Sequence, residues 1–414
     1  MQRRFSILVW CRQDLLAVLV FLALAATACE APTSSTSTET RTRLGDTLVV
    51  TTDPGIDQGP SLYAVELDLT IGELDSPEEY VLFPTSVSSD GEGRIFVSNQ
   101  REGEIRIFDA QGQYLKRFGR RGDGPGEFNS NAWGWFHVRS VAGQRLTVED
   151  LPRLRIFDAQ GVYLSSFDLL SVLVDGERRY ASPPGVLWVP ELETIVARWS
   201  LRLPDGGREE SMALLSDALS VLQELPAREV AGPFQGEDWN LTLPHSPRYD
   251  WAVAGNRILA WGVSDEYRID LYDLEGEGWV RVEFLLPPDP VTSAEIQAFK
   301  DEFLSKGWVQ GQEGVWEPRL NRAEYPETKP YFAEILGDDE GQIWVRRYSP
   351  ILGPDGDDWV RYDLFDGGGR WLGIVDSPVT FEEIRGGFGY RINRDEFPRV
   401  ERYRLLETSP PRTS

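Results

Sequence analysis

The sequence of 414 residues contains only two cysteines, two histidines and two methionines. Cys11 and Cys29 both fall near the N-terminus, so the rest of the chain has no thiol for a disulfide. Zinc and copper sites need thiolate or imidazole ligands, which are therefore scarce. The sequence also lacks the HExxH, G-x-S-x-G and P-loop motifs. These absences argue against the metalloprotease, serine hydrolase and nucleotide-hydrolase chemistries that such motifs mark.

The sequence also has fewer basic than acidic residues. Lys and Arg together number 42, against 67 Asp and Glu, which gives a formal net charge of −25. A field of this sign repels nucleic-acid phosphates and anionic lipid head groups, so we expect no nucleic-acid partner. The simplest interpretation of the acidity is that it keeps an extracytoplasmic protein in solution.

The N-terminal segment reads as a targeting signal. Three arginines precede an apolar run at 15–26 that is too short for a comfortable membrane span. The small residues that follow lead to Cys29, an arrangement similar to a bacterial lipobox. We therefore predict a lipoprotein-type signal peptide at 1–28, with Cys29 lipidated and the protein held at the cell envelope by that anchor alone. The alternative, an ordinary signal peptide with an incidental cysteine, stays open.

Downstream of the signal, two regions differ in composition. Residues 29–44 are rich in Ser and Thr and show no apolar periodicity, so we predict a flexible tether there. Residues 45–410 are predicted to form a single folded domain.

A repeated phrase indicates the architecture of this domain. RIFDAQG occurs at 106–112 and again at 155–161, each time flanked by alternating apolar residues, as in a β-hairpin with a four-residue Asp…Gly turn. Weaker copies continue along the chain, and an incomplete one ends it. Such four-stranded units predict an all-β fold, a six-bladed β-propeller of four-stranded antiparallel blades. The turn aspartates are Asp109, Asp158, Asp217, Asp273 and Asp366.

Two further features refine this prediction. The incomplete last unit needs a strand, which the N-terminal segments at 46–50 or 62–69 could supply, closing the ring and removing a free edge. A helix is predicted near 291–306, because Thr292 and Glu295 form a capping box ahead of an apolar stripe.

A family resemblance agrees with the repeat. FGRRGDGPGEF (118–128) resembles the inter-blade phrase of NHL-type propellers, and GRIFVSN and GQIWVRR resemble the strand that follows it. The segment 325–345 is similar to a group of bacterial six-bladed propeller lipoproteins. The resemblance extends over about 62–406 and implies the fold. It implies little about activity, because propellers serve as binding, lyase, lactonase and scaffold proteins.

We expect a ligand-binding rim on one face of the propeller. Loops between the second and third strands of a blade share a face with the loops that enter the next blade, and polar and aromatic residues gather there. Arg346 and Arg347 could offer a guanidinium fork to a ligand carboxylate, or one of them could pair with an acidic residue of another blade. The rim residues are Asn99, Asp123, Trp133, Trp135, Glu149, Asp150, Arg346 and Arg347.

No catalytic or metal-binding residue is predicted. His137 is interpreted as structural, and the acidic clusters at 338–340 and 355–358 as solvated turns without EF-hand spacing, although calcium stays open as a cofactor. The leading hypothesis is a lipid-anchored, extracytoplasmic, non-catalytic module that binds a ligand or a partner protein. The alternative is a calcium-dependent lyase or lactonase-like hydrolase with its site in the central channel. A purely structural envelope component is the third hypothesis.

Overall fold

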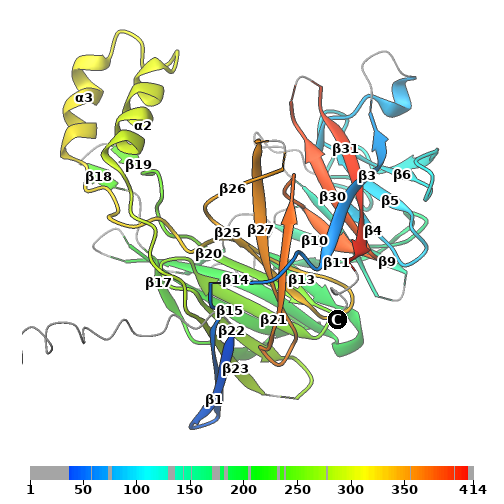
Figure 1. Cartoon of the computed structure of the whole chain (residues 1–414). Helices are drawn as coiled ribbons and strands as arrows, with labels where there is room; N and C mark the ends of the chain where they lie inside the picture. Colours follow the sequence, from blue (N-terminus) through cyan, green and yellow to red (C-terminus); the bar gives the residue numbers. More distant parts are fainter. Residues whose placement is uncertain are drawn as a thin grey trace, which may run out of the picture.

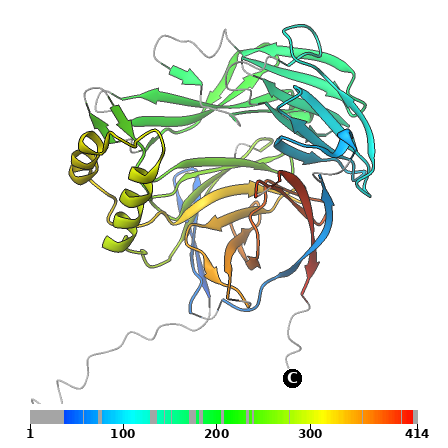
Figure 2. The ribbon, with the colours of Figure 1, turned by 90° about the horizontal axis from the view of Figure 1, so that it is seen from above.

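This computed structural model describes residues 37–408, except 57, 73–76, 129–135, 143, 151, 170–177, 181–184, 204–206, 231–233, 237–238, 277, 355 and 396. Within this part of the chain, six sheets follow one another around a common centre as the blades of a propeller (Figures 1 and 2). The predicted six-bladed β-propeller is therefore confirmed. No helix in these ranges is long and apolar enough to cross a membrane.

The first three blades are built from consecutive strands, and the first strand of each blade is the innermost. Blade one contains β4 (Pro84–Ser89), β5 (Ile95–Asn99), β6 (Glu104–Phe108) and β7 (Tyr114–Phe118). Blade two contains β8 (His137–Val141), β9 (Arg145–Asp150), β10 (Arg153–Asp158) and β11 (Tyr163–Asp168). Blade three contains β13 (Val186–Val189), β14 (Thr194–Arg202), β15 (Arg208–Ser216) and β16 (Val221–Glu224), with the short strands β12 (Arg178–Tyr180) and β17 (Arg228–Val230) beside them.

Blades four and six carry strands from the N-terminal part of the chain, and blade five carries a short extra strand. Blade four contains β20 (Tyr249–Ala254), β21 (Ile258–Val263), β22 (Arg268–Asp273) and β23 (Trp279–Phe284). Blade five contains β24 (Phe332–Gly337), β25 (Ile343–Arg347), β27 (Asp358–Phe365) and β28 (Trp371–Ser377), with β26 (Ile351–Leu352) paired to β27. Blade six contains β29 (Glu383–Arg385), β30 (Phe388–Asn393), β31 (Arg399–Glu407) and the N-terminal strand β3 (Tyr63–Ile71).

The ring closes through the pairing of β3 with β31, which is antiparallel and lies at the outer edge of blade six (Figure 1). This confirms one of the two segments proposed for closure. The other, at 46–50, lies in β2 (Thr47–Asp53), which pairs in parallel with β23 and widens blade four. Every blade thus has at least four strands, and blade six completes its set with a strand from the opposite end of the sequence.

Strand β1 (Thr38–Leu44) corrects the expected extent of the tether. All seven of its residues are exposed, yet the strand pairs with β2 along its whole length. Backbone hydrogen bonds to an existing edge hold it without apolar burial, which is why composition alone pointed to a flexible segment. Residues 29–36 of the predicted tether lie outside the described residues.

The hydrophobic core lies between neighbouring blades. Phe96, Ile105 and Ile107 of blade one pack against Val138 and Phe157 of blade two, and similar clusters fill the other junctions. The middle strands are buried on both faces, so that all five residues of β5 and of β6 are buried. Stacking of the blades therefore provides most of the apolar burial that stabilises the ring.

The repeated phrase has a structural explanation in its arginine and its aspartate. Arg106 is almost fully buried; it contacts the Glu104 carboxylate at 2.7 Å and donates to the carbonyl oxygens of Glu78 and Val81 at 2.8 Å. Arg155 is buried in the same way and pairs with Asp150. The turn aspartates accept backbone N–H groups from two and four residues ahead, at Gln111 and Gln113 in the first copy and Gln160 and Val162 in the second.

The insertion between blades four and five contains two helices, which project from the propeller in Figure 1. α2 (Ser293–Ser305) has the predicted capping box between Thr292 and Glu295. α3 (Glu313–Arg322) was not predicted, because Gly314 and Pro318 weaken its helical pattern. The helices share a small apolar core with the segment of β19 (Trp239–Leu241), which pairs with β18 (Phe234–Gly236); its buried members are Leu241, Leu243, Phe303, Val309 and Leu320.

Candidate functional site

A cavity of about 290 Å³ lies at the centre of the ring, where the inner strands of all six blades face one another. It is the central channel of the propeller, and nine of its lining residues are ionisable. They come from inner strands or the residues next to them: His137, Arg139, Asp250, Glu334, Asp338, Asp339, Glu382, Glu383 and Arg385.

Part of this polarity is structural, because an inner strand has no strand on its channel side to accept its N–H groups. Side chains of the preceding blade do so instead. The Asp250 carboxylate accepts the N–H of Ile335 at 2.5 Å, and Glu383 accepts the N–H of Ser89 at 2.7 Å. Similar bonds join Val138 to the Ser86 hydroxyl at 2.9 Å, Ser140 to the Ser88 hydroxyl at 2.8 Å and Gly185 to the Glu149 carboxylate at 3.2 Å.

One wall of the cavity is basic. Arg139 of β8 lines the cavity half-buried, and no described residue forms a hydrogen bond or ion pair with its guanidinium group. Burial lowers the pKa of Arg139, while Glu383 and Glu149 oppose this effect through space. Arg385 lies nearby, with Nη2 3.5 Å from the Ser140 carbonyl oxygen. Because a guanidinium group keeps its proton at neutral pH, this wall carries positive charge.

The opposite wall is acidic and titrates near neutrality. Blade two carries Arg139 and blade five carries Glu334, and these blades lie opposite each other in a ring of six. Burial raises the pKa of Glu334 to about 7, although Arg346 lowers it, and Asp250 adds a further rise. Burial likewise raises the pKa of Asp250 to about 6. The two carboxyl groups can therefore hold a proton at a pH where ordinary carboxyl groups are ionised.

His137 begins β8, two residues before Arg139, and also lines the cavity. Burial lowers its pKa to about 4, and the positive charges of Arg139 and Arg394 add to the effect. The imidazole is therefore neutral at pH 7 and can donate one hydrogen bond and accept another. The sequence favoured a packed or hydrogen-bonded histidine, whereas the structure places this ring on the channel wall.

The predicted rim residues are not brought together as one surface. Asn99, Glu149 and Asp150 are buried: Asn99 accepts the N–H of Phe83 at 3.0 Å, and the two acids accept from Gly185 and Arg155 respectively. Asp123 is exposed. Trp133 and Trp135 lie outside the described residues. The binding role assigned to this set stays a prediction.

Arg346 and Arg347 contact different partners within their own blade, so the alternative in which one of them pairs with an acidic residue of another blade is wrong. Arg346 contacts Glu334 on the adjacent strand, with Nε 3.1 Å from Oε2. Arg347 holds both oxygens of Asp363 at 2.8 Å, and Asp363 also accepts the Tyr267 hydroxyl at 2.6 Å. Successive residues of a strand face opposite sides, which separates the two arginines.

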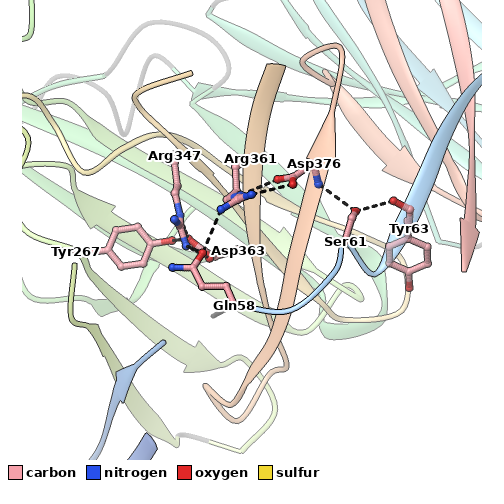
Figure 3. A network of polar contacts seen from close by, with 8 residues as sticks. All are labelled: Gln58, Ser61, Tyr63, Tyr267, Arg347, Arg361, Asp363 and Asp376. Carbon is pink, nitrogen blue, oxygen red and sulfur yellow. Dashed lines mark hydrogen bonds and ion pairs between the residues drawn. The ribbon is translucent and has the colours of Figure 1, made fainter. Parts of the chain in front are cut away.

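Arg347 belongs to a network that fastens the segment between β2 and β3 across blade five (Figure 3). The Gln58 side chain accepts from Arg347 at 3.0 Å and from Arg361 at 3.2 Å. Arg361 binds Asp376 through two contacts of 2.6 and 2.8 Å. Further along, the Ser61 hydroxyl accepts the N–H of Asp376 at 3.1 Å and donates to the Tyr63 carbonyl at 2.7 Å. These contacts position the strand that closes the ring.

The acidic clusters do not form a metal site in the described part of the chain, where no three His, Cys, Asp or Glu residues are grouped to hold an ion. Asp338 holds a turn by accepting the N–H groups of Glu340 and Gln342 and the indole N–H of Trp344. It is buried, so the interpretation of 338–340 as a solvated turn is wrong for this residue. Asp355 lies outside the described residues. The expectation of no cofactor, with calcium left open, stays a prediction.

Sequence reasoning missed Arg139, Arg385, Asp250 and Glu334. Arg139, Asp250 and Glu334 are charged residues inside short, largely apolar stretches that begin a blade, as in FHVRSV and YDWAVA, whereas Arg385 follows closely after two glutamates. That interruption was a usable signal, because an innermost strand has one side on the channel.

The acidic wall predicts a pH dependence that Glu334→Gln should remove. A folded-state pKa raised from 4.5 to about 7 means that the folded protein binds this proton more tightly than the unfolded chain. The resulting stabilisation is present at low pH and is lost as the pH rises through about 7. The unfolding free energy of Glu334→Gln minus that of wild type should therefore increase by about 1–3 kcal/mol as the pH rises from about 5 to about 8. Urea denaturation of both proteins across this range measures the difference. Parallel pH profiles would contradict the assignment.

Comparisons with known proteins agree with the architecture. The family model DUF5128, described as a 6-bladed beta-propeller, matches residues 79–132. A member of the DUF4221 family from Bacteroides vulgatus is 13% identical, with 84% of this chain and 99% of that chain covered and a TM-score of 0.49. No curated protein matches this chain.

Two solved propellers with named activities are more distant. A gluconolactonase from Xanthomonas campestris is 13% identical over 88% of this chain and 99% of that one, with a TM-score of 0.38. The calcium-binding protein regucalcin from Agrobacterium tumefaciens is 10% identical over 83% and 97%, with a TM-score of 0.36. Likenesses this remote say nothing about the activity of this chain. What the comparisons and the structure support together is a six-bladed β-propeller.

Proposed function

We propose that this protein is a non-catalytic binding module that holds a small polar molecule in its central channel. The observation that carries the proposal is Arg139, a charged group on the cavity wall with no contact partner among the described residues. A half-buried charge without a partner is costly, and a ligand that pairs with it gains that energy. The neutral His137 and the proton-holding Glu334 give the same cavity further donors and acceptors.

The arrangement favours binding over catalysis. Ser89 donates to Glu383 at 3.0 Å and Ser88 at 2.6 Å; the shorter contact, that of Ser88, resembles an activated nucleophile in the described channel. The Ser88 hydroxyl is fully buried and also accepts the N–H of Ser140, so it belongs to the framework between blades. A nucleophile must reach the reacting atom, and this one does not face the cavity.

We further propose that the module works outside the cytoplasm and is attached to the membrane by a lipid on Cys29. This rests on the lipobox-like sequence before Cys29 and on the acidic composition. Cys29 lies outside the described residues.

A channel-narrowing variant tests the binding proposal. Glu382 is exposed and lines one end of the cavity, so Glu382→Trp should obstruct entry at little cost in folding. Purified wild-type and variant proteins are incubated with a small-molecule extract of the producing cells, desalted, and assayed for retained compounds by mass spectrometry. We expect at least about a tenfold loss of the retained compound in Glu382→Trp, or about 1.4 kcal/mol.

Asp123→Trp is the competing variant, because Asp123 is the exposed member of the predicted rim. It should retain the compound as wild type does. If Asp123→Trp lost the compound and Glu382→Trp retained it, the binding site would lie at the rim and not in the channel. A wild-type protein that retains no small molecule would overturn the proposed function.

A further inference from the structure

We propose that Arg139 and His137 form an oxyanion subsite, so that the channel ligand carries a carboxylate or phosphate group at the end that faces blade two. This inference rests on the proposed function and names the chemistry of its ligand. The two side chains are two residues apart on β8, and residues at this spacing project to the same side of a strand.

The carboxylates near Arg139 are already engaged with other donors. Glu383 accepts hydrogen bonds from the Ser88 hydroxyl at 2.6 Å and from the N–H and hydroxyl of Ser89 at 2.7 and 3.0 Å. Glu149 accepts the N–H of Gly185. These groups lower the electrostatic cost of Arg139 from a distance but do not contact it. Its five N–H donors are thus available to a group in the cavity.

Arg139 also differs from other buried or half-buried arginines of the same fold. Arg106, Arg155 and Arg347 each contact a carboxylate of their own blade. Such pairing is what a buried guanidinium group requires when its role is structural. Arg139 departs from this pattern, and it does so at the cavity wall.

The charge around the subsite has the sign that an anion requires. Arg385 reaches the same strand from blade six, and Arg394 acts on His137 through space. Their own carboxylate contacts, with Glu383 at 3.9 Å and Glu382 at 3.2 Å respectively, offset part of this charge. Asp250 and Glu334 on the other side of the cavity hold a proton near neutrality, and they offer an anion hydrogen-bonding groups there rather than positive charge. A ligand with one anionic end is therefore held in a single orientation.

The geometry of the guanidinium group selects the class of anion. Its planar fork matches the two oxygens of a carboxylate or of a phosphate, whereas a spherical halide cannot engage it in the same way. The neutral imidazole supplies one more N–H donor beside the fork. Carboxylate and phosphate share this chemistry, so the experiment must separate them.

Histidine NMR reports directly on the subsite, because the chain has only two histidines. His245 contacts the Tyr348 hydroxyl at 3.0 Å and is absent from the cavity lining, so it serves as the internal control. The purified full-length protein, labelled on histidine, is titrated with sodium acetate and with sodium phosphate, each against sodium chloride at equal ionic strength. The imidazole signals are followed with concentration and with pH.

We expect one of the two anions to shift the His137 signals saturably and to raise its pKa from about 4 by at least about one unit, since a bound anion offsets the nearby arginines. The His245 signals should not change. Saturation with acetate identifies a carboxylate subsite, and saturation with phosphate identifies a phosphate subsite. Arg139→Gln should abolish the shift, and Arg139→Lys should weaken binding at least about tenfold, because lysine keeps the charge but lacks the fork.

Arg370→Gln is the matched control, since Arg370 is exposed on an outer turn; it should bind as wild type does. Thermal melting of each variant shows whether it is folded. Unchanged His137 signals with both anions would overturn the oxyanion assignment. If the cell-extract compound is still retained in that case, the channel binds a ligand of another class; if it is not retained either, the proposed function fails as well.

Discussion

A chain that begins at Thr70 is expected to lose several kcal/mol of unfolding free energy compared with a chain that begins at Ser37. This is a large share of the ~5–15 kcal/mol that stabilises a typical domain. Removal of β3 uncovers the edge of β31, whose backbone groups pair with Tyr63–Ile71 along the whole strand. It also takes away Asp68, which holds Arg402 at 2.5 Å, and Arg402 is buried. A buried arginine without its partner adds to the loss.

A chain that begins at Pro54 is the matched control for this truncation. It lacks β1 and β2 but keeps β3 and the segment that Gln58 fastens to blade five. Blade four would then end at β23, with four strands as in the regular blades, and the loss is limited to the pairing of β2 and the burial of its residues Val49, Val50 and Thr52. In urea denaturation, the chain that begins at Ser37 should be the most stable, the chain that begins at Pro54 the next, and the chain that begins at Thr70 the least stable. Equal stability of the last two would show that β3 does not seal the ring.

Asp363→Ala is expected to lower the unfolding free energy by about 3–5 kcal/mol, the usual effect of removing one partner of a buried ion pair. Asp363 is fully buried and accepts three hydrogen bonds, two from Arg347 and one from Tyr267. The alanine leaves the guanidinium and the hydroxyl without this acceptor. Gln58 is then the remaining contact of Arg347 in the network of Figure 3.

Asp376→Ala provides the comparison within the same network. Asp376 also binds an arginine through two contacts, but both side chains of that pair remain 23% exposed, so water can replace the lost partner. We expect a loss of about 1 kcal/mol or less. Chemical denaturation of both variants at pH 7 measures the difference. If the two variants were equally destabilised, burial would not be the reason for the cost at Asp363.

The overall fold was predictable because its signals are local. The copies of RIFDAQG place an aspartate whose carboxylate accepts two backbone N–H groups, and the glycine of the turn takes φ of 78° and 76° in the two copies. Both features depend on a few neighbouring residues. The parallel pairing of β2 with β23 has no such signal, since it joins segments more than 200 residues apart through backbone groups that any sequence supplies.

The charged residues at strand ends and in loops, which the sequence pointed to, did not predict the site in the channel. Arg346 and Arg347 attract attention as adjacent charges at the end of a strand, yet each is paired within blade five. The charge of Arg139 interrupts a strand-like stretch of the sequence, but its importance comes from what lies around it: neighbours whose acceptors are already used and a cavity that six separate strands enclose. Which carboxylates are already engaged depends on contacts between blades, which a pattern along one strand does not contain.

The place where the N-terminal strands join the propeller determines how the molecule would sit on a surface. β1 is the outermost strand of a six-stranded sheet whose innermost strand is β20. At ~4.8 Å between neighbouring strands, the chain enters the fold roughly 24 Å away from the channel wall. A lipid on Cys29 would therefore hold the propeller by the outer edge of blade four, far from the central channel. The attachment itself would then lie away from the channel and would not cover the cavity at its centre.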